Sequence, residues 1–299
     1  FAGRGPSRPG VLWPYLAVAN GRGDELRIVD PAADRAVRSP GFGVALGLVL
    51  GRFALGMRDW HYGYWTDDLP LIPANLPVAQ ARYTDELMND IPAGVKTILD
   101  VGCGAGNTAR KLLDRGYEVV CLSPNAWLND EAQAAVGNRA KVYLSKFEEF
   151  ELDRKFDLIL FSESFLFMKA EVALAKAEAM LNPGGYILIS DIFKVPSDTK
   201  SPIGGGQDIR RYQAMMAASR FTMLKDTDMT AQIAPTFDLL NLAYQQAIMP
   251  AYALLRAKFE ASNPTLMKFV QWKWRKKIAK LEEKHFTGKR TGEHFRRHK

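Results

Sequence analysis

Two hydrophobic periodicities alternate through the middle of the chain. Short apolar runs typical of buried β-strands occupy residues 97–101, 117–123, 140–145, 156–162 and 186–193. Apolar residues at helical spacing stand between them, at 107–116, 126–137 and 169–181. Strands that alternate with helices in this way need crossover connections, which predicts an α/β fold with a parallel sheet.

The segments that flank this alternation are mostly helical in pattern. A strand-like stretch at 221–230 closes the alternation, and helical spacing then continues with pauses at three prolines, Pro235, Pro250 and Pro264. The first ten residues, FAGRGPSRPG, cannot bury an apolar face. We therefore expect four parts: a flexible or partly ordered N-terminal segment (1–40), a helical cap (41–95), an α/β core (96–230) and a helical, basic C-terminal segment (231–299).

The most apolar run is FGVALGLVLGRFALGM, residues 42–57. It carries Arg52 and four glycines, and it falls short of the ~20 residues that span a bilayer. We expect a buried or interfacial helix here and no transmembrane segment.

Positive charge is concentrated at one end of the chain. The net charge is +7, and residues 268–299 hold twelve Lys and Arg against three Glu. Such a segment either binds an anionic partner, a nucleic acid or a membrane surface, or is a solvated helix face. The two cysteines, Cys103 and Cys121, lack metal-ligand spacing, so we expect no metal site and free thiols in a reducing, cytoplasmic compartment.

A glycine-rich turn follows the first strand of the alternation. In LDVGCGAGN, residues 99–107, the glycines allow the backbone to turn tightly and to approach a ligand. In an open parallel sheet, ligands bind beyond the carboxyl ends of the strands. A dinucleotide is disfavoured, because Asp100 would oppose a phosphate and favour an ammonium group, and because the second strand ends in Ser123 rather than an acid.

The chain resembles class I S-adenosylmethionine-dependent methyltransferases in five motifs that occur in the same order. These motifs are ILDVGCGAGN, LSPN, SKFEEF, FDLILFSES and LNPGGYILISD. The resemblance covers roughly residues 60–230 and points to the small-molecule branch, which includes sarcosine-, tocopherol- and ubiquinone-type and cyclopropane-synthase-like methyltransferases. It implies a Rossmann-like sheet of seven strands with helices on both faces, and helical N-terminal and C-terminal additions that form a lid. The implied cofactor is S-adenosyl-L-methionine, with S-adenosyl-L-homocysteine as product.

The resemblance also implies a set of cofactor-binding residues. These are Tyr64, Trp65, Asp100, Gly102, Cys103, Gly104, Asn107, Ser123, Pro124, Asn125, Lys146, Phe147, Glu148, Ser162 and Phe165. Two positions depart from the family, which usually carries acids where Ser123 and Lys146 stand. We expect Phe147 to pack on adenine or to offer its backbone N–H, and Glu148 to accept a hydrogen bond from the adenine amino group.

The aromatic stretch WHYGYW, residues 60–65, is by composition alone a core cluster. In sarcosine- and tocopherol-type methyltransferases a similar H-x-G-Y-W segment folds over the cofactor. By this resemblance Tyr64 and Trp65 cover the methionine end, and His61 and Tyr62 face the acceptor. A free imidazole at His61 could serve as a base near neutral pH.

The catalytic candidates are His61, Tyr62 and Glu163. Glu163 follows the fourth strand and is a candidate for a raised pKa and base chemistry, although a structural acid would fit as well. Aromatic residues, the apolar run and a Met-rich segment favour a small hydrophobic acceptor of lipid, isoprenoid, quinone or natural-product type. We expect the basic C-terminus to dock peripherally on an anionic membrane; monomer and homo-oligomer both stay open.

Two other functions compete with small-molecule methylation. A nucleic-acid methyltransferase, acting on RNA, would use the basic C-terminus. Chemistry on DNA amino groups is disfavoured, because the loop SESF lacks the [DNS]PP[YF] motif of DNA amino-methyltransferases. Both cysteines also lie too early for the nucleophile of RNA 5-methylcytosine enzymes, so nucleic acid is disfavoured as a partner. A non-catalytic relative that binds the cofactor is the third hypothesis, supported by Ser123 and Lys146.

Overall fold

The computed structural model describes residues 16–19, 26–29, 42–197, 205–265, 267, 272–273, 275–276 and 291–299. Most of the predicted N-terminal segment, 1–40, and much of the basic segment lie outside these residues. Within the former, β1 (Leu16–Ala19) and β2 (Leu26–Val29) form an antiparallel pair.

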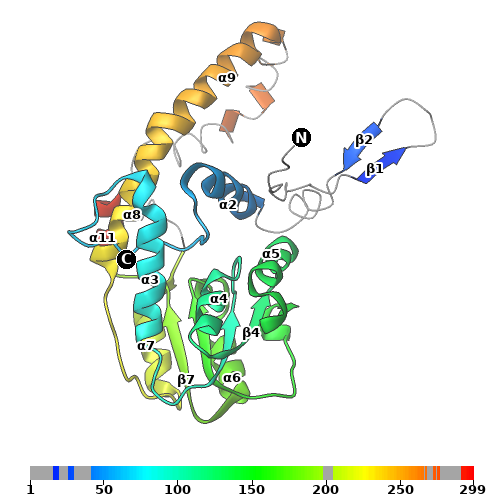
Figure 1. Ribbon diagram of the computed structural model, residues 1–299. Coiled ribbons are helices and arrows are strands. Elements are labelled where there is room, and N and C mark those ends of the chain that lie inside the picture. The colour runs from blue at the N-terminus through cyan, green and yellow to red at the C-terminus, as the bar shows by residue number, and fades with distance from the viewer. Residues whose placement is uncertain are drawn as a thin grey trace, which may run out of the picture.

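A five-stranded parallel sheet forms the centre of the molecule (Figure 1), in the order β5-β4-β3-β6-β7. Its strands are β3 (Thr97–Val101), β4 (Glu118–Ser123), β5 (Lys141–Leu144), β6 (Phe156–Ser162) and β7 (Leu181–Ser190). All five strands were predicted from the apolar runs. The predicted parallel α/β fold is therefore confirmed.

Helices cover both faces of the sheet because alternate strand residues point in opposite directions. Ile98 packs in one cluster with α3 (Leu76–Asn89), α4 (Asn107–Asp114) and α5 (Ala126–Val136). Its neighbour Leu99 packs in another cluster on the opposite face. That cluster contains residues of α6 (Ala170–Met180) and is flanked by residues of α7 (Ile209–Ala218).

The predicted total of seven strands is wrong for the described residues, whose main sheet has five. The strand-like stretch predicted at 221–230 is wrong, because residues 221–229 contain no strand and Thr230 begins α8. Lys225, Asp226 and Asp228 are exposed there, so the segment offers no alternating apolar face to bury. A short parallel pair, β8 (Phe193–Lys194) with β9 (Gln207–Asp208), stands apart from the main sheet.

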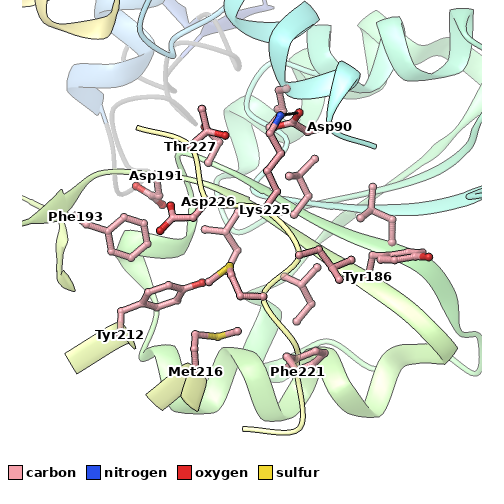
Figure 2. Close-up of a pocket in the computed structure, with 18 of the residues that line it drawn as sticks. Asp90, Tyr186, Asp191, Phe193, Tyr212, Met216, Phe221, Lys225, Asp226 and Thr227 are labelled. Carbon is pink, nitrogen blue, oxygen red and sulfur yellow. Dashed lines mark hydrogen bonds and ion pairs between the residues drawn. The ribbon is translucent and has the colours of Figure 1, made fainter. Parts of the chain in front are cut away.

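The outer edge of β7 is unpaired among the described residues, and a cavity of about 960 Å³ runs along it (Figure 2). The predicted strand began at Tyr186, but β7 begins at Leu181, which pairs with Phe156. Tyr186 pairs with Leu158, so residues 182–185 form an irregular bulge at the predicted turn.

Further helices from both flanks of the α/β core pack above the sheet in the view of Figure 1. They are α2 (Phe42–Leu55), the short η1 (Pro73–Asn75) before α3, α8 (Thr230–Ala243), the π-helical η5 (Tyr244–Ile248), α9 (Met249–Ser262) and α11 (Gly292–His298). The predicted pauses at Pro235 and Pro250 are wrong. Pro235 lies inside α8, and Pro250 lies in the first turn of α9, where a missing N–H costs little.

Smaller elements complete the described chain. They are η2 (Gly137–Arg139), η3 (Phe147–Glu149) and η4 (Phe165–Phe167). No helix among the described residues is both long enough and apolar enough to cross a bilayer.

Candidate functional site

The glycine loop lies at the carboxyl end of β3, between β3 and α4. Gly102, Gly104 and Gly106 have φ angles of 78°, 56° and 80°, which L side chains rarely adopt. The N–H groups of Gly102 and Cys103 donate to the carbonyl oxygen of Leu122 at 2.7 and 3.2 Å, which ties the loop to β4. A Cβ built on Gly104 would meet no atom within 4 Å, so the loop faces open space there.

Asp100 is the last-but-one residue of β3 and is 1% exposed. Its Oδ2 atom is buried without a hydrogen-bond partner among the described residues. Burial raises the pKa of Asp100 to about 7. A buried, unpartnered carboxylate beside a glycine loop is suited to pair with a ligand cation.

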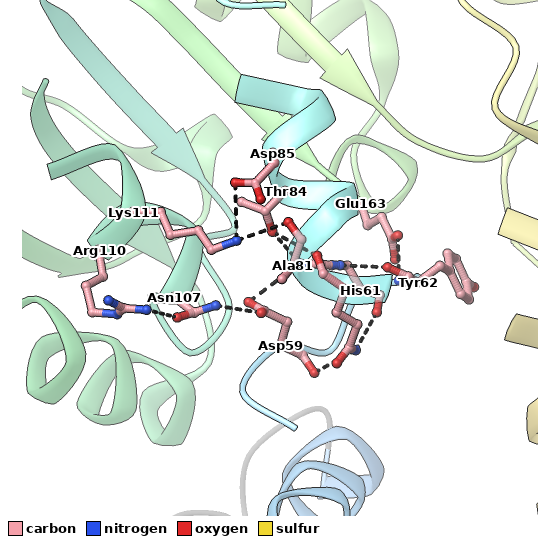
Figure 3. A network of polar contacts seen from close by, with 11 residues as sticks. Asp59, His61, Tyr62, Ala81, Thr84, Asp85, Asn107, Arg110, Lys111 and Glu163 are labelled. Atoms are coloured by element: carbon pink, nitrogen blue, oxygen red, sulfur yellow. Dashed lines mark hydrogen bonds and ion pairs between the residues drawn. The ribbon is translucent and has the colours of Figure 1, made fainter. Parts of the chain in front are cut away.

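A polar network joins this loop to the segment that carries the aromatic stretch (Figure 3). The Asn107 amide, in the first turn of α4, donates to Asp59 Oδ2 at 2.6 Å. Asp59 Oδ1 lies 3.5 Å from His61 Nε2. Gln80 of α3 donates to the carbonyl oxygens of both Asp59 and His61, which holds their backbone against the helix.

The resemblance predicts a free imidazole at His61, but both ring nitrogens lie within hydrogen-bond distance of protein atoms. Nδ1 donates to the Tyr62 carbonyl oxygen at 2.8 Å, and Nε2 lies 3.1 Å from Thr84 Oγ1. The ring stacks on Tyr83 with centroids 4.6 Å apart. Burial lowers the pKa of His61, but the hydrogen bond and charge of Asp59 outweigh it, so the pKa is raised overall.

Glu163 lies at the junction of the network and the cavity. Its φ of 52° makes it the one non-glycine residue with positive φ in the described chain. Its Oε1 accepts from the Tyr62 N–H at 2.9 Å, and its own N–H donates to Ser190 O at 2.8 Å. Burial raises the pKa of Glu163 to about 7, and burial raises that of Asp191 to about 6.

The aromatic stretch divides between the cavity and the core. Trp65 is 5% exposed, and its indole N–H donates to Thr236 Oγ1 of α8 at 2.9 Å. Tyr64 lines the cavity, and its N–H donates to Ala79 O. The Tyr62 ring also lines the cavity and contacts Phe237, with centroids 4.9 Å apart. His61 does not line the cavity itself, but its ring stacks on Tyr83, which does. That His61 faces the acceptor stays a prediction.

The residues predicted to meet the ribose serve as local supports. Ser123 Oγ accepts from the Asn125 N–H at 3.3 Å, and Asn125 Oδ1 caps α5 by accepting from the Leu128 N–H at 3.1 Å. Pro124 between them is exposed. Cys103, predicted beside the loop, is 7% exposed and a free thiol.

The residues predicted to meet adenine differ in how far they are buried. Lys146 forms an ion pair with Glu149 at 2.8 Å, and Glu148 is half-buried. The Phe147 ring is 3% exposed and packs edge-on against Phe161, so the ring belongs to the core. An adenine contact through the Phe147 backbone N–H stays a prediction.

Phe165 is also a core residue, with 0% exposure, and Ser162 ends β6.

Sequence reasoning missed the roles of Asp59 and Tyr83. Asp59 directly precedes WHYGYW, and an acid two residues from a histidine was the available signal. Tyr83, whose hydroxyl lies 2.6 Å from Ser190 Oγ, had no such signal, because it is one aromatic residue on a helix.

The carboxyl end of β7 opens into the cavity, where acids and aromatic rings face one another (Figure 2). The residues at this end are Tyr62, Tyr64, Glu163, Asp191, Phe193 and Tyr212. The glycine loop and the cavity are thus joined by one partly buried polar network.

The model of the methyltransferase domain family matches residues 76–225, half of the chain. The chain therefore belongs to this family of S-adenosyl-L-methionine-dependent enzymes, as the motifs predicted. The residues present fit the cofactor, because Asp100 has an unpartnered buried oxygen for its ammonium group and Gly104 leaves room for close approach.

Curated relatives agree with the family. An uncharacterized methyltransferase of Geobacillus kaustophilus is 31% identical over 100 residues, which is 32% of this chain and 46% of that protein. One of Bacillus mycoides is 27% identical over 121 residues, 40% of this chain and 57% of that protein. The chain thus spans about half the length of these relatives.

Solved structures share the fold at low identity. The cyclopropane synthase MmaA2 of Mycobacterium tuberculosis is 20% identical with a TM-score of 0.59, over 73% of this chain and 87% of that one. Geranyl diphosphate C-methyltransferase of Streptomyces coelicolor, solved with S-adenosyl-L-homocysteine, is 16% identical with a TM-score of 0.57, over 70% and 86%. The [4+2]-cyclase SpnF, at 19% and 0.58, covers 71% and 82%.

Proposed function

We propose that this protein transfers a methyl group from S-adenosyl-L-methionine to a small, hydrophobic acceptor that binds at the carboxyl end of β7. The observation that carries the proposal is the cavity of about 960 Å³ that reaches this end. Ligand pockets for small molecules are concave, mostly apolar and supplied with a few polar groups. The tyrosines, Phe193 and Met216 supply apolar surface, and Glu163 and Asp191 supply polar groups.

The cofactor site in this proposal is the glycine loop with its neighbours. Asp100 pairs with the ammonium group, and Gly104 gives the backbone close approach. Asn107 and Asp59 hold the loop and the aromatic segment together. When bound, S-adenosyl-L-methionine supplies an electrophilic methyl group.

The chain then has to align the acceptor and, where the acceptor carries a proton, remove it. Alignment alone supplies much of the rate enhancement in reactions of this kind. Glu163 is the proposed proton acceptor, because it lines the cavity and a pKa near 7 suits a base at neutral pH. His61 is a positioning residue in this proposal, since both of its ring nitrogens are engaged within the protein.

Lipids, isoprenoids, quinones and related natural products are the acceptor classes that fit an apolar pocket with a carboxylate at its inner end. The solved structures with a similar fold include a geranyl diphosphate methyltransferase and cyclopropane synthases, whose substrates support a hydrophobic acceptor here by analogy only. The membership in the methyltransferase family carries the reaction type, and the cavity carries the acceptor class.

The test is an acceptor screen with the purified chain. Members of each acceptor class are incubated with S-adenosyl-L-methionine, and products are detected by the mass gain of one CH₂ group. S-adenosyl-L-homocysteine is quantified in parallel, because its formation without acceptor would report cofactor turnover alone. We expect a methylated product from an apolar acceptor. Methylation of RNA, with none of any small molecule, would contradict the proposal.

A further inference from the structure

Helix α2 presents an exposed apolar stripe. Leu46, Val49, Leu50 and Phe53 are 46%, 44%, 58% and 94% exposed. Their spacing of three, one and three residues places all four on one face of the helix. Apolar side chains of this size gathered on one exposed face mark an interaction surface rather than ordinary surface scatter.

The opposite face of α2 fixes the helix on the domain. Ala45 and Leu48 are buried with Trp127 of α5, and Arg52 forms an ion pair with Glu131 at 2.7 Å. The ring of Trp60 lies where a side chain at Gly47 would stand. Helix α2 is therefore packed against the domain through one face, and its apolar stripe faces outward.

A second exposed apolar stripe lies on the helix that continues from α8. Ile248, Tyr252, Leu255 and Phe259 are 53%, 40%, 71% and 42% exposed, at spacings of four, three and four residues. Leu55 at the end of α2 packs in the same cluster as Leu239 of α8. Figure 1 shows α2 and α9 on the same side of the sheet.

Basic residues accompany these stripes. Arg58 is exposed just after α2, and Lys273, Arg275 and Lys276 are exposed beyond α9. Residues 268–299 hold twelve Lys and Arg against three Glu. Apolar helix faces with flanking cations match an anionic bilayer, where apolar side chains enter the interface and cations meet the headgroups. A second copy of the chain, with a net charge of +7, would bring like charges together.

We propose that the exposed face of α2, supported by the face of α9, docks the protein on an anionic lipid surface. Phe53 enters the interface deepest, because it is the most exposed residue of the stripe. The segment that follows α2 reaches Asp59 and His61 within a few residues, so docking places the entrance of the site close to the lipid.

The experiment is vesicle co-sedimentation of the full chain with phosphatidylcholine vesicles, with and without phosphatidylglycerol. The wild type should bind the anionic vesicles, and added salt should weaken this binding. Phe53→Glu should lower the partition coefficient about tenfold or more, and Val49→Glu several-fold. The matched control is Val172→Glu, because Val172 is 43% exposed on α6, close to the 44% of Val49, and should change binding less than twofold.

A second readout does not depend on an added charge. Phe53→Cys labelled with an environment-sensitive dye should shift to the blue on anionic vesicles; Cys103 and Cys121 are buried and should stay unlabelled. Failure of the wild type to bind, equal binding by Val49→Glu and Val172→Glu, or an unshifted dye would overturn the proposal. So would a lipid-free dimer that Phe53→Glu separates into monomers, because a second copy would then cover the face.

Discussion

The two ends of the site differ in how fully the protein satisfies its own polar groups. At the proposed cofactor end, Asp59, His61 and Asn107 hold one another, and Asp100 Oδ2 and Gln80 Oε1 are buried without a hydrogen-bond partner among the described residues. At the acceptor end, carboxylates and aromatic rings line a cavity along an unpaired strand edge. The first region leaves individual buried polar atoms for specific ligand groups. The second region leaves the choice of ligand to shape and apolar contact.

This difference teaches where specificity resides. A buried polar group that needs a hydrogen-bond partner from the ligand rejects ligands that lack this partner. An apolar pocket discriminates only weakly between similar ligands. The cofactor end should therefore respond sharply to single polar substitutions. The acceptor end should respond to changes in proton transfer and in pocket shape.

The largest effect is expected at Glu163. Glu163→Gln should lower the turnover number by roughly 10² to 10⁴, the usual contribution of a general base, for an acceptor that loses a proton. Binding of S-adenosyl-L-homocysteine should stay within a few-fold of wild type. Wild-type turnover should rise with pH through about 7, where Glu163 ionises, and the variant should lose this rise. A variant with the wild-type pH profile would remove Glu163 from the reaction.

Two adjacent aromatic residues separate stability from binding. Trp65→Ala should lower the free energy of unfolding by roughly 3 to 5 kcal/mol, because a buried indole leaves a cavity and Thr236 loses its donor. Tyr64→Ala should weaken cofactor binding more than it lowers stability, because Tyr64 is only half-buried and the resemblance of WHYGYW implies that it covers the methionine end of the cofactor. Thermal unfolding and calorimetry on both variants check this contrast. The reverse pattern would return Tyr64 to the core and place Trp65 at the ligand.

Asp100 should trade stability against binding. Its folded pKa of about 7 exceeds the unfolded value of 3.8, so the free protein loses stability as pH rises between these values. Asp100→Asn should therefore stabilise the free protein at pH 8 by roughly 2 to 4 kcal/mol, and at pH 4 by little. Denaturant titrations at both pH values measure this difference. Equal differences at the two pH values would show that burial does not hold the proton on Asp100.

Substitution of His61 should change the free energy of unfolding least, and it should destabilise the protein where substitution of Asp100 stabilises it. Its pKa is raised in the folded protein, so its ion pair with Asp59 stabilises fully below pH 6.5 and fades as pH rises through the folded pKa. His61→Gln should cost about 1 kcal/mol at pH 6 and less at pH 9. A pH-independent loss would point to packing against Tyr83 instead.

The sequence predicted the fold where local patterns are strong. The strand at 97–101 and its glycine loop came from apolar runs and from glycines that need positive φ, and both are confirmed. The strand-like stretch predicted at 221–230 was wrong because isolated β-propensity does not supply a partner or a buried face. The pause at Pro235 was wrong because tertiary packing on residues 63–65 holds α8 intact.

The site was predictable only along its motifs. Asp100, Gly104 and Asn107 follow from one short stretch of sequence, and the structure brings them to the carboxyl edge of the sheet. The contacts of His61 with Thr84 and Tyr83 could not be predicted from the sequence. Both partners lie on α3, and only the packed structure fixes which face of that helix meets His61. Trp65 and Tyr64 divide between core and cavity for the same reason.

The central claim is that Asp100 receives the ammonium group of the cofactor. Calorimetric titration with S-adenosyl-L-homocysteine near pH 6.5, in two buffers of different ionisation enthalpy, tests it most directly. A cation beside Asp100 lowers the pKa of its carboxyl group, so binding should release part of a proton in the wild type and less in Asp100→Asn. Absence of binding, or the same proton release in both proteins, would contradict the claim.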